Sequence, residues 1–203
     1  MLERPGGDFV YLAGSTDKVV SLVEAVKARV RREWGHRTTP LPVVAITDGA
    51  RCIRTDLLAL FGASVSIILD WYHLEKRVYE HLSMSAHSRA DREEWERRVL
   101  GLLWQGRVEE ALAFLQGLSP RNAAKRDELV GYLEKHTTEI IDYERRSACG
   151  KSIGSGRMEK AVDQVIGIRQ KMKGMSWSER GSQTLASLKI AELNGEWEQL
   201  FAA

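Results

Sequence analysis

Acidic residues that follow predicted strands are the first candidates for chemistry in this chain. Asp48 stands directly after an apolar run, in Thr47-Asp48-Gly49-Ala50, and Asp70 directly after another. A carboxylate in such a place can hold a divalent metal ion, because hard cations prefer oxygen ligands. It can equally form a turn or cap the next helix, and both interpretations stay open. His73 follows Asp70 by one turn, within reach of its carboxylate, and can also be an ordinary packing residue.

A second pair of carboxylates follows a glycine-rich stretch near the end of the chain. Glu159 comes after Ser152-Ile153-Gly154-Ser155-Gly156-Arg157-Met158, and Asp163 comes one helical turn later. Two like charges at this spacing repel each other unless solvent or a cation separates them. Glu159, near a predicted helix N-terminus, can also be a surface residue that compensates the helix dipole.

Two sequence motifs, one for nucleotide binding and one for acyl transfer, are only partly matched in this sequence. Gly150-Lys151-Ser152 ends like a P-loop, but Arg145 stands where the first glycine is required. Gly154-Ser155-Gly156 lacks the spacing of a nucleophile elbow, and no predicted strand precedes it. Walker-type ATP binding and serine hydrolase chemistry are therefore not expected.

The elements that position these residues alternate in type along the first part of the chain. Strands are predicted at Phe9–Leu12, Val43–Ile46 and Val65–Leu69, and helices at Asp17–Trp34 and Arg51–Phe61. The two later strands are continuous apolar runs, which are typical of strands buried on both faces. A parallel pair of them places Asp48 and Asp70 at neighbouring carboxyl ends, where open α/β sheets have their sites.

The rest of the chain is predicted to be helical. From Leu74 to Arg146 the apolar residues recur at helical spacing, and Gly106, Gly117 and Pro120 separate the helices. Two more helices are predicted at Met158–Lys171 and Glu179–Asn194. The sequence therefore indicates a large helical block after the second strand of the parallel pair.

Composition and charge limit the class of protein. The chain has 203 residues, 43% of them hydrophobic, and a net charge of +2, which excludes a histone-like polycation. No stretch is apolar enough to span a membrane and no signal-peptide core is present, so a soluble cytoplasmic protein without membrane contact is expected. Cys52 and Cys149 are predicted to be free thiols.

Three strings of the sequence together resemble DDE transposases, in particular bacterial insertion-sequence transposases of the Kra type. They are Asp48-Gly49-Ala50, Ile68-Leu69-Asp70-Trp71-Tyr72-His73-Leu74 and Gly154-Ser155-Gly156-Arg157-Met158-Glu159. The tail Met172-Lys173-Gly174-Met175-Ser176-Trp177-Ser178 and its continuation to Phe201 add to the resemblance. It covers roughly Val43 to Phe201.

The resemblance implies an α/β fold with a ribonuclease H-like core and an all-helical insertion. Its expected parts are residues 1–83 as a partial core, 84–149 as the insertion and 150–203 as C-terminal helices that complete the core. It implies DNA strand cleavage and transfer, in which three acidic residues bind two Mg²⁺ or Mn²⁺ ions. The second aspartate of the family falls on Asp48 and its glutamate on Glu159, as catalytic residues and metal ligands. Asp70 and His73 match an accompanying motif with a supporting role.

The chain departs from the family pattern at its beginning. The first aspartate of such a core belongs on the first strand, and two strands should precede the helix at Asp17–Trp34, whereas only Phe9–Leu12 is predicted. We therefore expect an N-terminally incomplete core without the first catalytic aspartate, for which Asp8 is the nearby substitute. A noncatalytic DNA-binding or dimerising remnant is the alternative, and a phosphotransfer protein using Asp70 or His73 a third.

The expected partner is double-stranded DNA, both the transposon ends and the target. Whether the chain forms a homodimer is left open. Between Asp91 and Glu144 the chain has 8 basic and 12 acidic residues, but between Arg145 and Lys189 it has 10 and 3. Basic residues so grouped can contact backbone phosphates, or simply form a solvated helix face. The candidates for DNA contact are Lys151, Arg157, Lys160, Arg169, Lys171 and Lys173.

Overall fold

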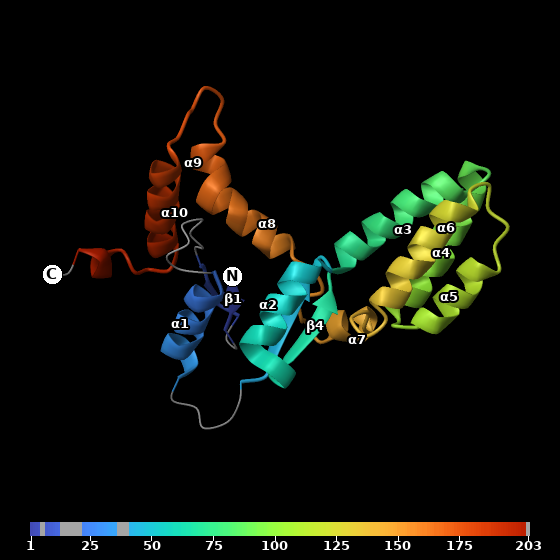
Figure 1. Cartoon of the computed structure of the whole chain (residues 1–203), viewed down its shortest axis with the longest axis horizontal. Helices are drawn as coiled ribbons and strands as arrows, with labels where there is room; N and C mark the ends of the chain where they lie inside the picture. The colour runs from blue at the N-terminus through green and yellow to red at the C-terminus, as the bar shows by residue number, and fades with distance from the viewer. Residues whose placement is uncertain (5–6, 13–21, 36–40, 202–203) are drawn as a thin grey trace. The chain divides into compact units, whose positions relative to one another are not determined.

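The computed structural model describes residues 1–4, 7–12, 22–35 and 41–201 (Figure 1). The structure is mixed α/β, with 64% helix and a few short strands. The chain divides into two compact units, Met1–Leu41 with Gly156–Ala203, and Pro42–Ser155. We call them the terminal unit and the central unit. The three-part domain division expected from the resemblance stays a prediction.

The central unit begins with a strand, a helix and a second strand. β3 (Val43–Thr47) and β4 (Val65–Leu69) pair in parallel, with Thr47 opposite Leu69. Such a pair needs a crossover connection, which α2 (Arg51–Phe61) and the short 3-10 turn η1 (Gly62–Ser64) provide. Gly62 ends α2 at a φ of 54°, a conformation that favours glycine.

This first part of the central unit confirms the predicted order of strand, helix and strand. The bounds of α2 and β4 are those predicted, and β3 extends to Thr47. The expected burial of both faces is wrong for β3, because the Val44 side chain is 50% exposed. β4 is better buried, since Leu69 at its end is fully covered.

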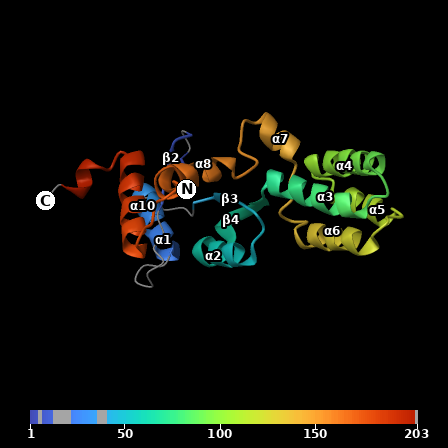
Figure 2. The same ribbon diagram turned by 90° about the horizontal axis from the view of Figure 1, so that it is seen from above.

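Between β4 and Ser155 the central unit is helical, as predicted. Its helices are α3 (Trp71–Ser85), α4 (Arg89–Trp104), α5 (Val108–Gln116), α6 (Ala123–Lys135) and α7 (Tyr143–Ala148). Figures 1 and 2 show α3 to α6 lying side by side as a bundle, in which α3 and α5 each contact α4 and α6. Leucines from neighbouring helices, among them Leu82, Leu103 and Leu133, are fully buried between them.

An aromatic cluster joins this bundle to the parallel strands. Trp71 meets Trp104 edge to face at 4.8 Å between ring centroids, and its ring lies 5.0 Å from that of Tyr143. The Tyr143 hydroxyl donates to the carbonyl oxygen of Leu69 at 2.8 Å, and burial raises the pKa of this phenol. The last residue of β4 is therefore fixed by a side chain 74 positions later.

The terminal unit joins the two ends of the chain. β1 (Leu2–Glu3) and β2 (Phe9–Val10) pair antiparallel, and α1 (Leu22–Trp34) follows. From the C-terminal part come α8 (Gly156–Val162), the π-helical stretch η2 (Asp163–Gly167), α9 (Ile168–Gln170), α10 (Glu179–Leu193) and the 3-10 turn η3 (Glu198–Leu200).

The terminal unit corrects the prediction for its first segment. The strand predicted at Phe9–Leu12 ends at Val10, and an unpredicted strand at Leu2–Glu3 pairs with it. Two short strands therefore precede α1, where only one was expected. Residues 17–21 of the helix predicted at Asp17–Trp34 lie outside the described residues.

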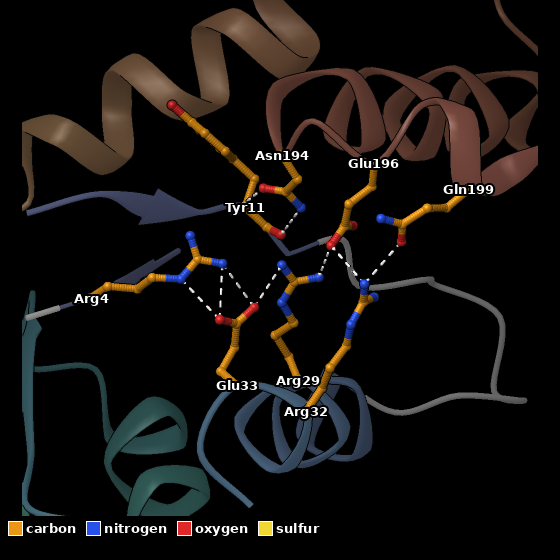
Figure 3. A network of polar contacts seen from close by, with 8 residues as sticks. All are labelled: Arg4, Tyr11, Arg29, Arg32, Glu33, Asn194, Glu196 and Gln199. Carbon is orange, nitrogen blue, oxygen red and sulfur yellow. Dashed lines mark hydrogen bonds and ion pairs between the residues drawn. The ribbon is translucent and has the colours of Figure 1, made fainter. Parts of the chain in front are cut away.

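A network of polar contacts holds the terminal unit together (Figure 3). Arg29 of α1 pairs with Glu33 at 2.9 Å and with Glu196, after α10, at 2.7 Å. Arg4 approaches Glu33 from the hairpin at 2.9 Å. Asn194 bonds the backbone of Tyr11 twice, at 2.8 and 3.1 Å. These contacts connect the hairpin, α1 and the end of α10.

Candidate functional site

Asp48 lies at the carboxyl end of β3 with its side chain exposed to solvent. Its Oδ1 accepts a hydrogen bond from the backbone N–H of Ala50 at 2.9 Å, which closes a tight turn. Ala50, not Asp48, is the N-cap of α2, and it makes no side-chain cap. The capping role considered for Asp48 is therefore wrong and the turn role is confirmed. No partner for Oδ2 is found within the described residues, so this oxygen can bind a ligand.

Asp70 is the N-cap of α3, which confirms the capping interpretation. Its side chain is 1% exposed, and Oδ1 accepts from the N–H groups of Tyr72 at 2.8 Å and His73 at 3.2 Å. Oδ2 accepts from the N–H of Ser155 at 2.5 Å. Burial alone would raise the pKa of Asp70, but the hydrogen bonds from Ser155, His73 and Tyr72 outweigh burial and lower it. The carboxylate is thus charged and its oxygens are occupied, which suits a supporting role better than metal binding.

The segment before Ser155 is held against the same strand end. The N–H of Trp71 donates to the carbonyl oxygen of Ile153 at 3.0 Å. Gly154 lies so close that a Cβ there would meet the Tyr72 ring at 2.5 Å and Asp70 Oδ1 at 3.1 Å. A larger residue at this position would require the Tyr72 ring, which is exposed, to move. The N–H of Asp70 in turn donates to the carbonyl oxygen of Thr47 at 2.7 Å. Asp70 therefore contacts both the residue before Asp48 and the loop that leads toward Glu159.

His73 is within reach of Asp70, as its spacing predicts. Its Nδ1 lies 3.5 Å from Asp70 Oδ2, which makes an ion pair when the imidazole is protonated. The His73 side chain is 44% exposed, so the ring also faces solvent. Asp70 and His73 are brought together by one turn of α3.

Glu159 lies in α8 of the terminal unit, and its side chain is exposed. Asp163 begins the π-helical stretch η2, so the two carboxylates are not on a regular α-helix throughout. Asp48, Asp70 and His73 belong to the central unit. The structure describes the two units separately, and the approach of Glu159 to Asp48 stays a prediction.

The carboxylates offer the right kind of donor for Mg²⁺ or Mn²⁺, but they form no complete set within either unit. Asp48 and Glu159 are exposed oxygen donors, while Asp70 uses its oxygens on backbone N–H groups. Among the described residues, no group of three or more histidine, cysteine, aspartate and glutamate side chains could hold a metal ion. The carboxylates of Asp48 and Glu159 are suitable ligands for these ions. They supply two carboxylates, one from each unit.

The basic residues proposed for DNA contact are all exposed, but they are not equivalent. Arg157 is engaged within the terminal unit, where it pairs with Glu3 at 3.7 Å and stacks over the Phe9 ring at 4.7 Å. Lys151 belongs to the central unit and the others to the terminal unit. No ion pair within the described residues engages Lys151, Lys160, Arg169, Lys171 or Lys173.

A buried polar cluster near Gly49, the residue after Asp48, was not predicted from the sequence. His136 Nδ1 lies 2.6 Å from Glu139 Oε2, and Glu139 Oε1 lies 2.7 Å from Arg54 of α2. A Cβ at Gly49 would meet the His136 ring at 2.7 Å. The sequence signal for this pair is the spacing of three positions between His136 and Glu139, just after α6.

Comparison with known proteins gives no assignment. No family model, curated protein or solved structure matches the chain. Among the described residues, no helix is both long enough and apolar enough to cross a membrane.

Proposed function

We propose that this chain is part of a DDE-type DNA transposase, in which Asp48 and Glu159 serve metal-dependent cleavage and transfer of DNA strands. The observation that supports this proposal most is that Asp70 forms hydrogen bonds with two separate segments of the chain. It bonds the backbone of Thr47, directly before Asp48, at 2.7 Å, and the backbone of Ser155, four residues before Glu159, at 2.5 Å.

The number of residues between Ser155 and Glu159 limits the distance between them. Four residues span at most about 14 Å when fully extended, and about 6 Å along an α-helix. Chain length therefore keeps Glu159 within about 14 Å of Ser155, and the meeting of Glu159 with Asp48 is part of the proposal.

The ribonuclease H-like core with a helical insertion is part of the proposal. It is supported by a parallel strand pair with Asp48 after its first strand, and by the helical stretch α3 to α7 between β4 and α8. The two short strands before α1 pair with each other in a sheet separate from that of β3 and β4, so the joining of these strands into one core is itself part of the proposal. The source of a first aspartate stays open.

Asp48 and Glu159 would hold Mg²⁺ or Mn²⁺ in this proposal. A bound divalent ion would supply electrostatic stabilisation of charge on the phosphodiester oxygens. The chain's own residues position the ligands: the turn at Ala50 fixes Asp48 Oδ1, and the Asp70 contacts fix both adjoining segments. Exposed basic residues, Lys151 and Lys160 among them, would bind the DNA backbone by charge.

Metal binding to the purified chain tests the pair. Mn²⁺ is titrated against Asp48→Asn and Glu159→Gln, with Asp56→Asn and Glu198→Gln as controls, since these remove one exposed carboxylate from each of the same two units. Loss of a true ligand should weaken binding at least as much as an outer-shell change, about 10–100-fold. The controls should leave binding unchanged.

Either outcome for Glu159 is informative. If Glu159→Gln binds Mn²⁺ as tightly as the parent chain, Glu159 is not a ligand and the proposed pair is wrong. A chain that binds duplex DNA but no metal would favour the alternative, a noncatalytic DNA-binding or dimerising protein.

A further inference from the structure

A basic cavity of about 450 Å³ opens in the central unit beside the end of β3. Gly49, the first turn of α2 and the end of α6 line it, and the charged side chains facing it are Arg51, Arg54 and Lys135. None of the described residues that line this cavity is acidic. Its volume lies within the range typical of small-molecule sites, which is about 300–1,000 Å³.

The wall of this cavity contains a buried histidine. His136 is 2% exposed, and its Nδ1 is engaged with Glu139 Oε2 at 2.6 Å. Its other nitrogen, Nε2, has no hydrogen-bond partner among the described residues, although the ring lines the cavity. With Nδ1 donating to Glu139, Nε2 carries a proton only in the imidazolium form, and in that form it can donate to a phosphate oxygen in the cavity.

Glu139 holds two of the residues that line the cavity and does not cancel the positive charge of the lining. Its carboxylate joins His136 on one oxygen and Arg54 on the other, at 2.6 and 2.7 Å. One negative charge therefore offsets one of the three cations. Arg51 and Lys135 have no ion-pair partner in the part of the chain that the structure describes. They leave an excess of positive charge in the lining; the acidic residues nearest along the chain, Asp48, Asp56 and Glu134, are exposed and do not line the cavity.

The start of α2 adds to this positive field. α2 has 11 residues, no acidic residue in its first turn and no side-chain cap at Ala50. The N–H of Ala50 is taken by Asp48, but the N–H groups of the first turn after it are left for solvent or a ligand, at residues that line the cavity. An anion with several oxygen atoms can be met here by backbone N–H groups and guanidinium forks together.

We infer that this cavity binds a phosphate group, supplied by the backbone of a DNA strand. Arg51, Arg54 and Lys135 provide the positive charge of the lining, and His136 donates from Nε2 when its imidazole is protonated. The phosphate chemistry follows from the cavity alone, whereas DNA as its source rests on the proposed function. A free phosphate or a nucleotide has the same chemistry and is the other source to be tested.

Two measurements on the whole chain test the cavity. The first is the affinity for a labelled DNA duplex as a function of salt, for the parent chain and for the double variant Arg51→Gln with Lys135→Gln. The control is the double variant Arg97→Gln with Arg98→Gln, which removes two cations from another cavity that also contains Glu94. The second is the NMR signal of the His136 Cε1–H during titration with inorganic phosphate; the chain has 5 histidines, so the signal can be assigned.

The expected result is a loss of DNA affinity of about tenfold in the cavity variant, with a salt slope reduced by about two and little change in the control. Phosphate should shift the His136 signal and compete with the duplex. If the parent chain binds phosphate at His136 but does not bind DNA, the cavity is a phosphate site for a small molecule, and DNA as the source of the phosphate is wrong. Equal losses in both double variants, or a His136 signal that phosphate never shifts, would overturn the proposal.

Discussion

The backbone N–H of Ser155 donates to Asp70 Oδ2 at 2.5 Å, joining residues that are 85 positions apart. The acceptor is 1% exposed, and its other oxygen caps α3 through Tyr72 and His73. One carboxylate thus ends a strand, starts a helix and anchors the loop after the helical block. A supporting residue with these contacts should matter to folding as well as to the site.

Replacement of Asp70 by alanine should cost about 2–4 kcal/mol of unfolding free energy. Loss of an N-cap costs about 0.5–2 kcal/mol, and a donor left buried without a partner costs about 1–3 kcal/mol. Asp142→Ala is the control, because Asp142 is an exposed N-cap that accepts one bond, from Arg145 at 2.8 Å. Denaturant unfolding of both variants checks the difference, and equal costs would contradict the role of the Ser155 contact.

The pH dependence of stability should report the same carboxylate. The pKa of Asp70 in the folded chain is lowered from its ordinary value of 3.8, so the unfolded chain binds the proton more tightly. The stabilisation by ionised Asp70 is therefore fully present above about pH 4 and is lost as the pH falls through the lower, folded value.

The test is the difference in unfolding free energy between the parent chain and Asp70→Asn, measured from neutral pH down to acid pH. The difference should be constant near neutrality and should shrink below the ordinary aspartate pKa. If this difference in unfolding free energy grows as the pH falls, the pKa of Asp70 is not lowered in the folded chain and the prediction is wrong.

Gly49→Ala should destabilise the central unit by about 1–3 kcal/mol. Gly49 has a φ of 84°, which L side chains rarely adopt, and its Cβ would meet His136 Cε1 at 2.7 Å. Gly131→Ala in α6 is the matched control, since a Cβ there meets nothing within 4 Å. It should stabilise the helix by about 0.5–1 kcal/mol. Opposite signs in thermal unfolding are expected, and the same sign would refute the close contact.

Much of the helical structure could be predicted because its signal is local. The apolar spacing and the break at Gly62 placed α2 correctly, and the continuous run at Val65–Leu69 placed β4. The strand Leu2–Glu3 could not be predicted, because two residues have no period and exist as a strand only through pairing with Phe9–Val10. The exposure of Val44 was missed because an apolar run reveals hydrophobicity but not what covers it.

The candidate site was predictable only in part for the same reason. Strand ends pointed to Asp48 and Asp70, and the capping of α3 by Asp70 followed from residue type. The contact of Asp70 with Ser155 is non-local, and nothing in either segment signals it. His136 was missed because its neighbours Gly49 and Arg54 come from a distant part of the chain.

Arg29→Met should strongly destabilise the terminal unit, although methionine keeps most of the apolar stem. The Arg29 side chain is 10% exposed and lies between Glu33 and Glu196, which are 14% and 19% exposed. Removing the cation takes the shared partner from two mostly buried carboxylates, which keep Arg4 and Arg32 respectively, so the expected cost is about 1.5–3 kcal/mol. Lys27→Met is the control, because its pair with Glu24 is exposed and such pairs contribute about 0–1 kcal/mol. Hydrogen exchange of α1 and α10 amides would localise the loss, and equal protection in both variants would show that the network of Figure 3 does not hold this unit together.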